Sequence, residues 1–153
     1  MRMPNSPIIA CDTSTEAQEL CKQMAELNQV NVEVNGYCSS RDLQACSDAP
    51  RTLIISDCEG YETELFTPET CTALRTHDLL IECHDFIDIE TTRILMDRLT
   101  GTHSLTLYQS IDDILKAYEY DYPELANYCL AERKILLAEN RPAIMRWIFA
   151  QAK

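Results

Sequence analysis

Glycine is scarce in this chain, with three residues among 153, at Gly36, Gly60 and Gly101. As a result, no glycine-rich turn precedes the first acidic segment, although open α/β sheets that bind nucleotides commonly carry one. Long apolar runs are missing as well, because no stretch approaches the roughly 20 residues that span a bilayer. The sequence therefore predicts no membrane-spanning helix.

Basic residues are also few, because 13 lysines and arginines stand against 25 acidic residues and the net charge is −12. Such a chain repels nucleic-acid phosphates and anionic membranes, so we expect neither as a partner. Residues 1–6 lack the apolar core of a secretory signal. We therefore expect a cytoplasmic protein.

Cysteine is abundant, with eight residues, but the paired spacing of a zinc ribbon is absent. Cys11, Cys58 and Cys83 lie at or just beyond apolar runs, where a free cysteine packs as a small hydrophobic residue. This spread favours reduced thiols in a cytosolic protein over a disulfide framework.

Twice in the sequence, a short apolar run ends on a cluster of acids. The run TLIIS at 52–56 is followed by DCEGYE at 57–62, and the run LLI at 79–81 is followed by ECHD at 82–85. A continuous apolar run of this length is typical of a strand buried on both faces of a parallel sheet. Because ligands bind at the carboxyl ends of such strands, the acids stand where a site is expected.

The order of patterns along the chain predicts one α/β domain spanning residues 1–153. The expected strands are 7–11, 30–34, 52–56, 79–83, 104–108 and 145–149. The expected helices are one that follows caps at 13–15 and ends near Asn28, then 40–45, 62–66, 68–75, 89–99, 112–117 and a long one over 124–140. This alternation predicts a Rossmann-like, mostly parallel sheet with helices on both faces.

These features, in this order, resemble class I S-adenosylmethionine (SAM)-dependent methyltransferases. The D-x-E-G-x-E pattern at 57–62 is closest to the FkbM-like branch, and the segment 139–147 resembles the last, antiparallel strand region of such proteins. The resemblance spans nearly the whole chain. It begins at the family's second strand, so the chain is expected to be truncated at its N-terminus and to lack the glycine-rich strand, turn and helix that hold the methionine end of SAM.

The resemblance implies a set of cofactor-binding residues. Asp12, followed by Thr13, would accept hydrogen bonds from the ribose hydroxyls of SAM, whereas the alternative for Asp12 is a helix cap. Tyr37 and Cys38 follow Gly36, where such folds flank the adenine, and an ordinary turn is the alternative there. Asp57 would face both cofactor and substrate.

Asp57, Glu59 and His84 are the candidate catalytic residues. A close pair of carboxylates can share a proton and act as a general base, and a histidine beside them supplies an acid/base pair. The alternatives are an acidic cluster that begins a helix, or an oxygen and nitrogen ligand set formed by Asp57, Glu82 and His84. The remaining histidines, His77 and His103, are expected at the surface.

Three functions follow from these assignments. The first is methyl transfer from SAM to an oxygen or nitrogen of a small molecule or sugar. The second is a non-catalytic, methyltransferase-like interaction protein that has lost the cofactor. The third is a divalent-metal-dependent hydrolase. We expect SAM to bind this chain weakly or not at all, because only glycine allows the close backbone approach of the missing turn.

The missing strand also has a structural consequence. In this family it is the centre of the sheet, between the strands that end at Asp12 and Asp57. Without it, two rows of backbone groups need new partners. We expect residues 8–10 to pair directly with residues 53–55, and the alternative is a second copy of the chain in a homodimer.

Overall fold

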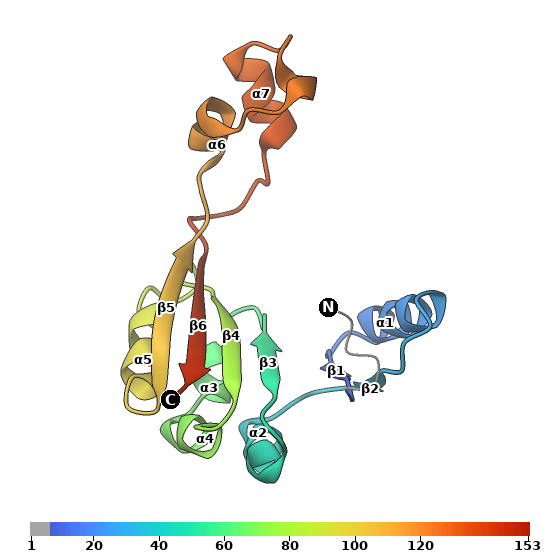
Figure 1. The fold of residues 1–153 in the computed structure, drawn as a ribbon, viewed down its shortest axis with the longest axis vertical. Coiled ribbons are helices and arrows are strands. Elements are labelled where there is room, and N and C mark those ends of the chain that lie inside the picture. Colours follow the sequence, from blue (N-terminus) through green and yellow to red (C-terminus); the bar gives the residue numbers. More distant parts are fainter. Residues whose placement is uncertain (1–6) are drawn as a thin grey trace.

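The computed structural model describes residues 7–153, and over this range the chain is a mixed α/β protein with two sheets (Figure 1). The expectation of no secretory signal concerns residues 1–6, outside the described residues. The strands are β1 (Ile9–Cys11), β2 (Glu33–Asn35), β3 (Leu53–Ser56), β4 (Asp78–Cys83), β5 (His103–Gln109) and β6 (Arg146–Ala152).

Helices connect these strands throughout the described range. The α-helices are α1 (Thr15–Leu27), α2 (Ser40–Ala45), α3 (Glu62–Leu65), α4 (Pro68–Ala73), α5 (Thr91–Leu99), α6 (Asp113–Glu119) and α7 (Leu130–Leu137). Two short 3₁₀ helices cover Cys46–Asp48 and Pro123–Leu125. None of the helices in residues 7–153 combines the length and the apolar character needed to cross a membrane.

The larger sheet has the strand order β3-β4-β6-β5. Strand β3 pairs in parallel with β4, while β6 runs antiparallel to both β4 and β5. Strands β3, β4 and β5 therefore point the same way, and the prediction of an antiparallel last strand is confirmed. Because two of the three pairings involve β6, the sheet is mixed rather than mostly parallel.

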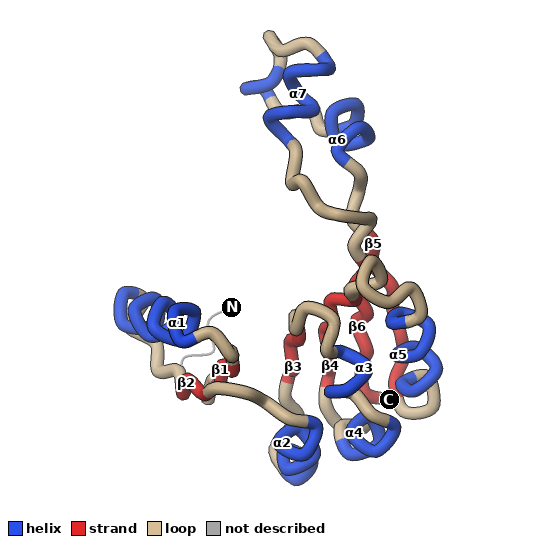
Figure 2. Tube along the Cα trace, turned by 180° about the vertical axis from the view of Figure 1, so that it is seen from behind, coloured by secondary structure: helices blue, strands red, loops and turns tan. Residues whose placement is uncertain are grey.

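The core lies on one face of this sheet. Leu79, Ile81 and Cys83 alternate along β4 and are almost completely buried, which matches the period of two of a strand. Helices α3, α4 and α5 lie on this same side, as Figure 2 shows. Leu95 of α5 is fully buried there, as its predicted apolar stripe requires.

The opposite face of the larger sheet is not covered by a helix in the described part of the chain. Leu53 and Ile55 of β3 point to this face and are 54% and 68% exposed. Ile55 is in register with Leu80 of β4, which in turn is in register with Phe149 of β6. The expectation of helices on both faces is therefore wrong for this sheet, because the helix that follows β1 stays beside the other, smaller sheet.

Strands β1 and β2 form a separate two-stranded parallel sheet, with α1 between them in the sequence. None of these three elements contains a buried residue. Within residues 7–153, β1 pairs with β2 alone and β3 with β4 alone, and Figure 1 shows a gap between β1 and β3. Direct pairing of residues 8–10 with residues 53–55 is thus wrong, and both facing strand edges remain without a ladder partner.

Helices α6 and α7 form a pair that stands beyond the ends of β5 and β6 (Figure 1). Lys116 of α6 is buried and forms an ion pair with Glu139, whose pKa this hydrogen bond lowers to about 2. The prediction of one long helix over 124–140 is wrong. The chain breaks there because Pro123 begins a 3₁₀ turn and α7 starts anew at Cys129, whose backbone N–H donates to the Glu132 carboxylate over 2.8 Å.

His77 and His103 are buried rather than exposed, with relative exposures of 0% and 1%. Nδ1 of His77 accepts a hydrogen bond from the backbone N–H of Thr52 over 3.2 Å, and Nε2 of His103 lies 3.1 Å from the carbonyl oxygen of His77. These bonds join the starts of β3, β4 and β5. The prediction that both histidines lie at the surface is therefore wrong, because their burial arises from contacts between strands that are distant in the sequence.

Candidate functional site

The acids after β3 and β4 meet at one edge of the larger sheet. Ser56, the last residue of β3, is in register with Ile81 of β4. The two strands are parallel, so the segments that follow them leave the sheet side by side. The structure thus confirms that Asp57 and Glu82 lie at one edge, whereas Asp12 follows β1 in the other sheet.

The loop between β3 and α3 contains two consecutive residues with a positive φ. Glu59 has a φ of 52° and Gly60 a φ of 98°, both in the left-handed region. The positive φ of Gly60 is what favours glycine here, because the nearest atom to an added Cβ is Cδ1 at the end of the exposed Ile87 side chain, which can move away. A non-glycine residue held in this region, such as Glu59, is a feature of functional loops.

His84 is the centre of the site and is only 2% exposed. Its Nδ1 lies 2.5 Å from Oε1 of Glu62, a carboxylate that is itself fully buried and accepts a hydrogen bond from the Gly60 N–H. Because an ionised Glu62 can only accept, we assign the ring proton to Nδ1. The lone pair of Nε2 is then directed away from Glu62.

Nε2 of His84 faces the two other acids of the loop. It lies 3.4 Å from Oδ1 of Asp57 and 3.4 Å from Oε2 of Glu59, whose side chains are 57% and 78% exposed. The structure therefore brings together all three candidate catalytic residues. It adds Glu62, the third acid of the D-x-E-G-x-E pattern, whose role depends on its burial against His84.

A cavity of about 270 Å³ opens beside this cluster. It is lined by Asp57, Glu59, Glu82, His84, Phe86, Arg141, Pro142 and Met145. Arg141 pairs with Glu82 over 3.2 Å and lies over the Trp147 ring, 5.3 Å from its centroid. Arg141 lies on the segment before β6, far from the acids in the sequence, so its sequence position did not predict that it lines the same cavity.

Glu82 does not belong to the cluster around His84, because its carboxylate is engaged by Arg141. The expected ligand set of Asp57, Glu82 and His84 is therefore corrected. Among the described residues, Asp57, Glu59 and His84 are the group whose ligand atoms lie within 4.8 Å of one another. Cys58, between the two acids, is a poor nucleophile at neutral pH because burial raises the pKa of its thiol to about 11.

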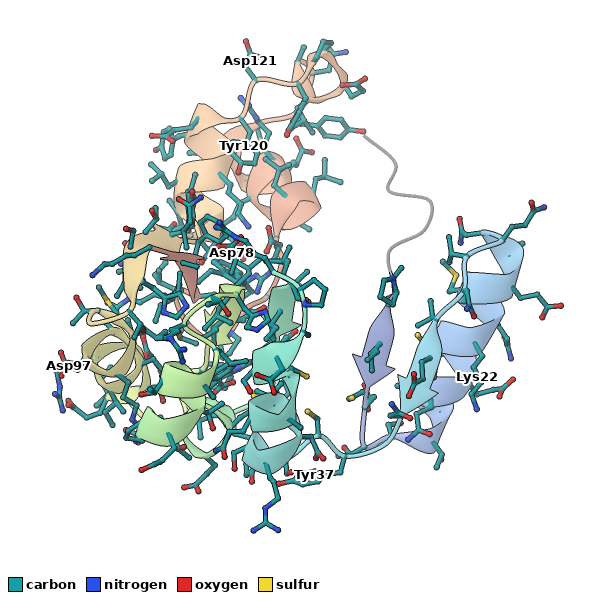
Figure 3. All side chains as sticks on the ribbon, turned by 60° about the horizontal axis from the view of Figure 1, so that its bottom comes forward. Lys22, Tyr37, Asp78, Asp97, Tyr120 and Asp121 are labelled. Carbon is teal, nitrogen blue, oxygen red and sulfur yellow. The ribbon has the colours of Figure 1, made fainter. Side chains whose placement is uncertain are left out.

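The other residues assigned to the cofactor lie in two places, at the start of α1 and on the segment after β2. Asp12 and Thr13 are exposed at the start of α1, where Oδ1 of Asp12 accepts a hydrogen bond from the Ser14 N–H over 2.7 Å. Tyr37 reaches the acidic loop, since its hydroxyl lies 2.5 Å from that of Tyr61. Figure 3 shows Tyr37 on the segment that leads from β2 toward the larger sheet.

Cys38 follows Tyr37 and packs against the core of the larger sheet. Burial is the main cause that raises the pKa of its thiol to about 11. The eight cysteines form no disulfide within the described residues. Tyr37 and Cys38 thus link the smaller sheet to the acidic loop, while Asp12 and Asp57 follow strands of different sheets.

No protein-family model matches the sequence, and no curated protein resembles it significantly.

Proposed function

We propose that the chain is a Rossmann-like domain of the class I SAM-dependent methyltransferase type, FkbM-like branch, that acts on an oxygen or nitrogen of a small molecule or sugar. The observation that carries the proposal is the buried His84, held by Glu62 so that Nε2 faces Asp57, Glu59 and an open cavity. Such a ring is positioned to take a proton from an acceptor hydroxyl or amine.

The strand order supports this proposal. The break between β1 and β3 falls where the resemblance requires the missing central strand, and β6 is reversed as the family's last strand is. The D-x-E-G-x-E segment follows β3, the strand that borders the break. Strand order and motif therefore both support the proposal.

The residues present fit one half of SAM. One carboxylate oxygen of Asp12 is bonded to the Ser14 N–H, which leaves the other oxygen as an acceptor for a ribose hydroxyl. The exposed Tyr37 ring offers a face for adenine. For the methionine half, the described residues contain no glycine-rich turn, so that end of the molecule lacks its usual backbone contacts.

When bound, SAM would supply an electrophilic methyl group, and its sulfur would keep the electron pair of the carbon–sulfur bond as that group is transferred. Nε2 of His84 would take the proton of an acceptor hydroxyl or amine in the adjoining cavity as the acceptor lone pair bonds to the methyl carbon. Glu62 holds the ring in place and stabilises its protonated form, and Asp57 and Glu59 add negative charge at the same nitrogen.

We expect weak SAM binding in which the adenosine half makes the contacts. Saturation-transfer NMR with millimolar SAM measures this, because it reports which ligand protons touch the protein. Strong saturation of the adenine and ribose protons and weak saturation of the S-methyl group are expected. Asp12→Ala should remove the ribose signal, while Asp97→Ala, an exposed acid of α5, should leave it unchanged. Uniform saturation, or a signal indifferent to Asp12→Ala, would contradict the assignment.

A second candidate is an interaction protein that has lost catalysis, and the open sheet edges favour it. Ile9 of β1 and Ile55 of β3 are 60% and 68% exposed on strands whose facing edges have no partner in residues 7–153. Exposed apolar strand edges favour pairing with another chain. A second copy can offer its β1 edge to β3 and accept the reciprocal contact, which satisfies both edges by twofold symmetry.

We therefore expect a homodimer. Light scattering coupled to size exclusion should give twice the 17.5 kDa chain mass. Ile55→Lys should shift the population to monomer, because it places a charge on the strand that borders the gap. Ile135→Lys on α7, where the native side chain is 76% exposed, is the matched control and should leave the dimer intact. A monomer at all concentrations would rule out the second copy as partner.

A further inference from the structure

The distances around His84 Nε2 do not describe a hydrogen bond. Nitrogen and oxygen atoms that share a proton lie about 2.7–3.2 Å apart. Nε2 lies 3.4 Å from both Asp57 Oδ1 and Glu59 Oε2, and neither contact meets the geometry of a hydrogen bond. Two carboxylates and a buried ring nitrogen therefore converge on a common point without bonding to one another.

The same distances match the spacing of ligands around a metal ion. Nitrogen and oxygen ligands bind zinc at about 2.0–2.2 Å, and tetrahedral ligands at that radius are separated by about 3.4 Å. The two observed separations from Nε2 have this value. All three ligand atoms lie within 4.8 Å of one another, so they can reach a single ion.

Burial and second-sphere contacts point to the same conclusion. His84 is 98% buried, yet its Nε2 has no hydrogen-bond partner among the described residues and is aimed at the acids. Glu62 accepts from Nδ1 on the other side of the ring. A carboxylate that holds the second nitrogen of a histidine is the usual support of a metal-bound histidine, because it fixes the tautomer and raises the basicity of the ligand.

The excess negative charge of the site also favours a bound cation. Three carboxylates, from Asp57, Glu59 and Glu62, surround one imidazole, which can offset a single charge at most. Within residues 7–153, no lysine or arginine pairs with Asp57 or Glu59, since the arginine of the cavity is paired with Glu82 and Glu139. A divalent ion between the two exposed acids offsets this excess.

We propose that Asp57, Glu59 and His84 bind a divalent cation of the zinc class. The fourth position faces the cavity and takes water or an oxygen of a bound ligand. With the ion bound, Nε2 is a ligand and no longer the base, and an oxygen held at the fourth position loses its proton more readily in its place. The proposal does not rest on methyl transfer, because metal binding is measured without SAM or an acceptor.

Calorimetric titration of the whole chain with Zn²⁺ tests the proposal. Cys11 and Cys129 are exposed thiols, so both are replaced by serine to prevent thiolate binding. One ion per chain is expected. Glu59→Gln should weaken binding more than about tenfold, and because Glu59 is 78% exposed this change leaves the fold intact. Glu64→Gln, an exposed acid on α3 outside the cluster, is the matched control and should bind as the parent does.

Absorption of the Co²⁺-loaded protein supplies a second readout. Visible bands typical of tetrahedral oxygen and nitrogen ligands are expected, and His84→Ala should abolish them. A parent chain that binds no Zn²⁺ would overturn the proposal. So would binding that Glu59→Gln and His84→Ala leave unchanged, since it would place the ion elsewhere.

Discussion

Replacement of Phe66 by alanine is expected to destabilise the protein by about 3–5 kcal/mol. Phe66 is fully buried at the end of α3, within the core that helices α3, α4 and α5 form on the larger sheet. The shortened side chain loses its transfer free energy and leaves a cavity. Because domains of this size are stable by only about 5–15 kcal/mol, such a loss removes much of the margin.

Denaturation by urea, followed by circular dichroism, measures the change in the free energy of unfolding. Tyr118→Ala is the matched aromatic control, because Tyr118 on α6 is 66% exposed, and it should change stability by no more than about 0.5 kcal/mol. Equal effects of the two substitutions would show that Phe66 does not lie in the core described here.

Removal of Glu62 is expected to have the second large effect. Glu62→Ala leaves the buried Nδ1 of His84 and the N–H of Gly60 without their acceptor, which costs about 3 kcal/mol. The His84 ring then loses the contact that directs Nε2 toward Asp57 and Glu59. Affinity for Zn²⁺ should fall by about 10–100-fold even though Glu62 does not touch the ion.

Glu62→Gln separates orientation from charge. The amide oxygen keeps the hydrogen bonds to Gly60 and His84, so stability should recover most of the loss seen with alanine. Urea denaturation and Zn²⁺ titration of the two variants side by side provide the measurement. If Glu62→Ala were as stable as the parent and bound Zn²⁺ equally well, Glu62 would have no role in holding the site.

Local patterns were sufficient to predict the strands that carry the site. The structure places β3 and β4 in parallel register over the runs at 52–56 and 79–83. Their acids therefore had to leave the same edge of the sheet. This is why Asp57, Glu59 and His84 could be chosen in advance from residue type and position alone. Burial of β3 on both faces was predicted wrongly, because Leu53 and Ile55 lie on the face that no helix covers within the described residues.

Features that depend on distant contacts were not predicted. Glu62 was not singled out because its importance comes from full burial against His84, and the burial of His77 and His103 depends on the pairing of β3, β4, β5 and β6. The gap between β1 and β3 exists because neither of the facing strand edges has a pairing partner within residues 7–153, and a local sequence pattern cannot predict this. The prediction of one helix over 124–140 was wrong because a proline and a new helix cap interrupt a segment whose composition is otherwise helical.

The most direct test of the methyltransferase proposal is the position of SAM on the protein. Amide chemical shifts of the ¹⁵N-labelled chain, recorded as SAM is added into the millimolar range, give this position residue by residue. We expect any shifts to gather at Asp12, Thr13, Tyr37, Cys38 and Asp57, and Asp12→Ala to remove those near the ribose. Shifts confined to α6 and α7, or shifts that Asp12→Ala leaves unchanged, would contradict the proposal.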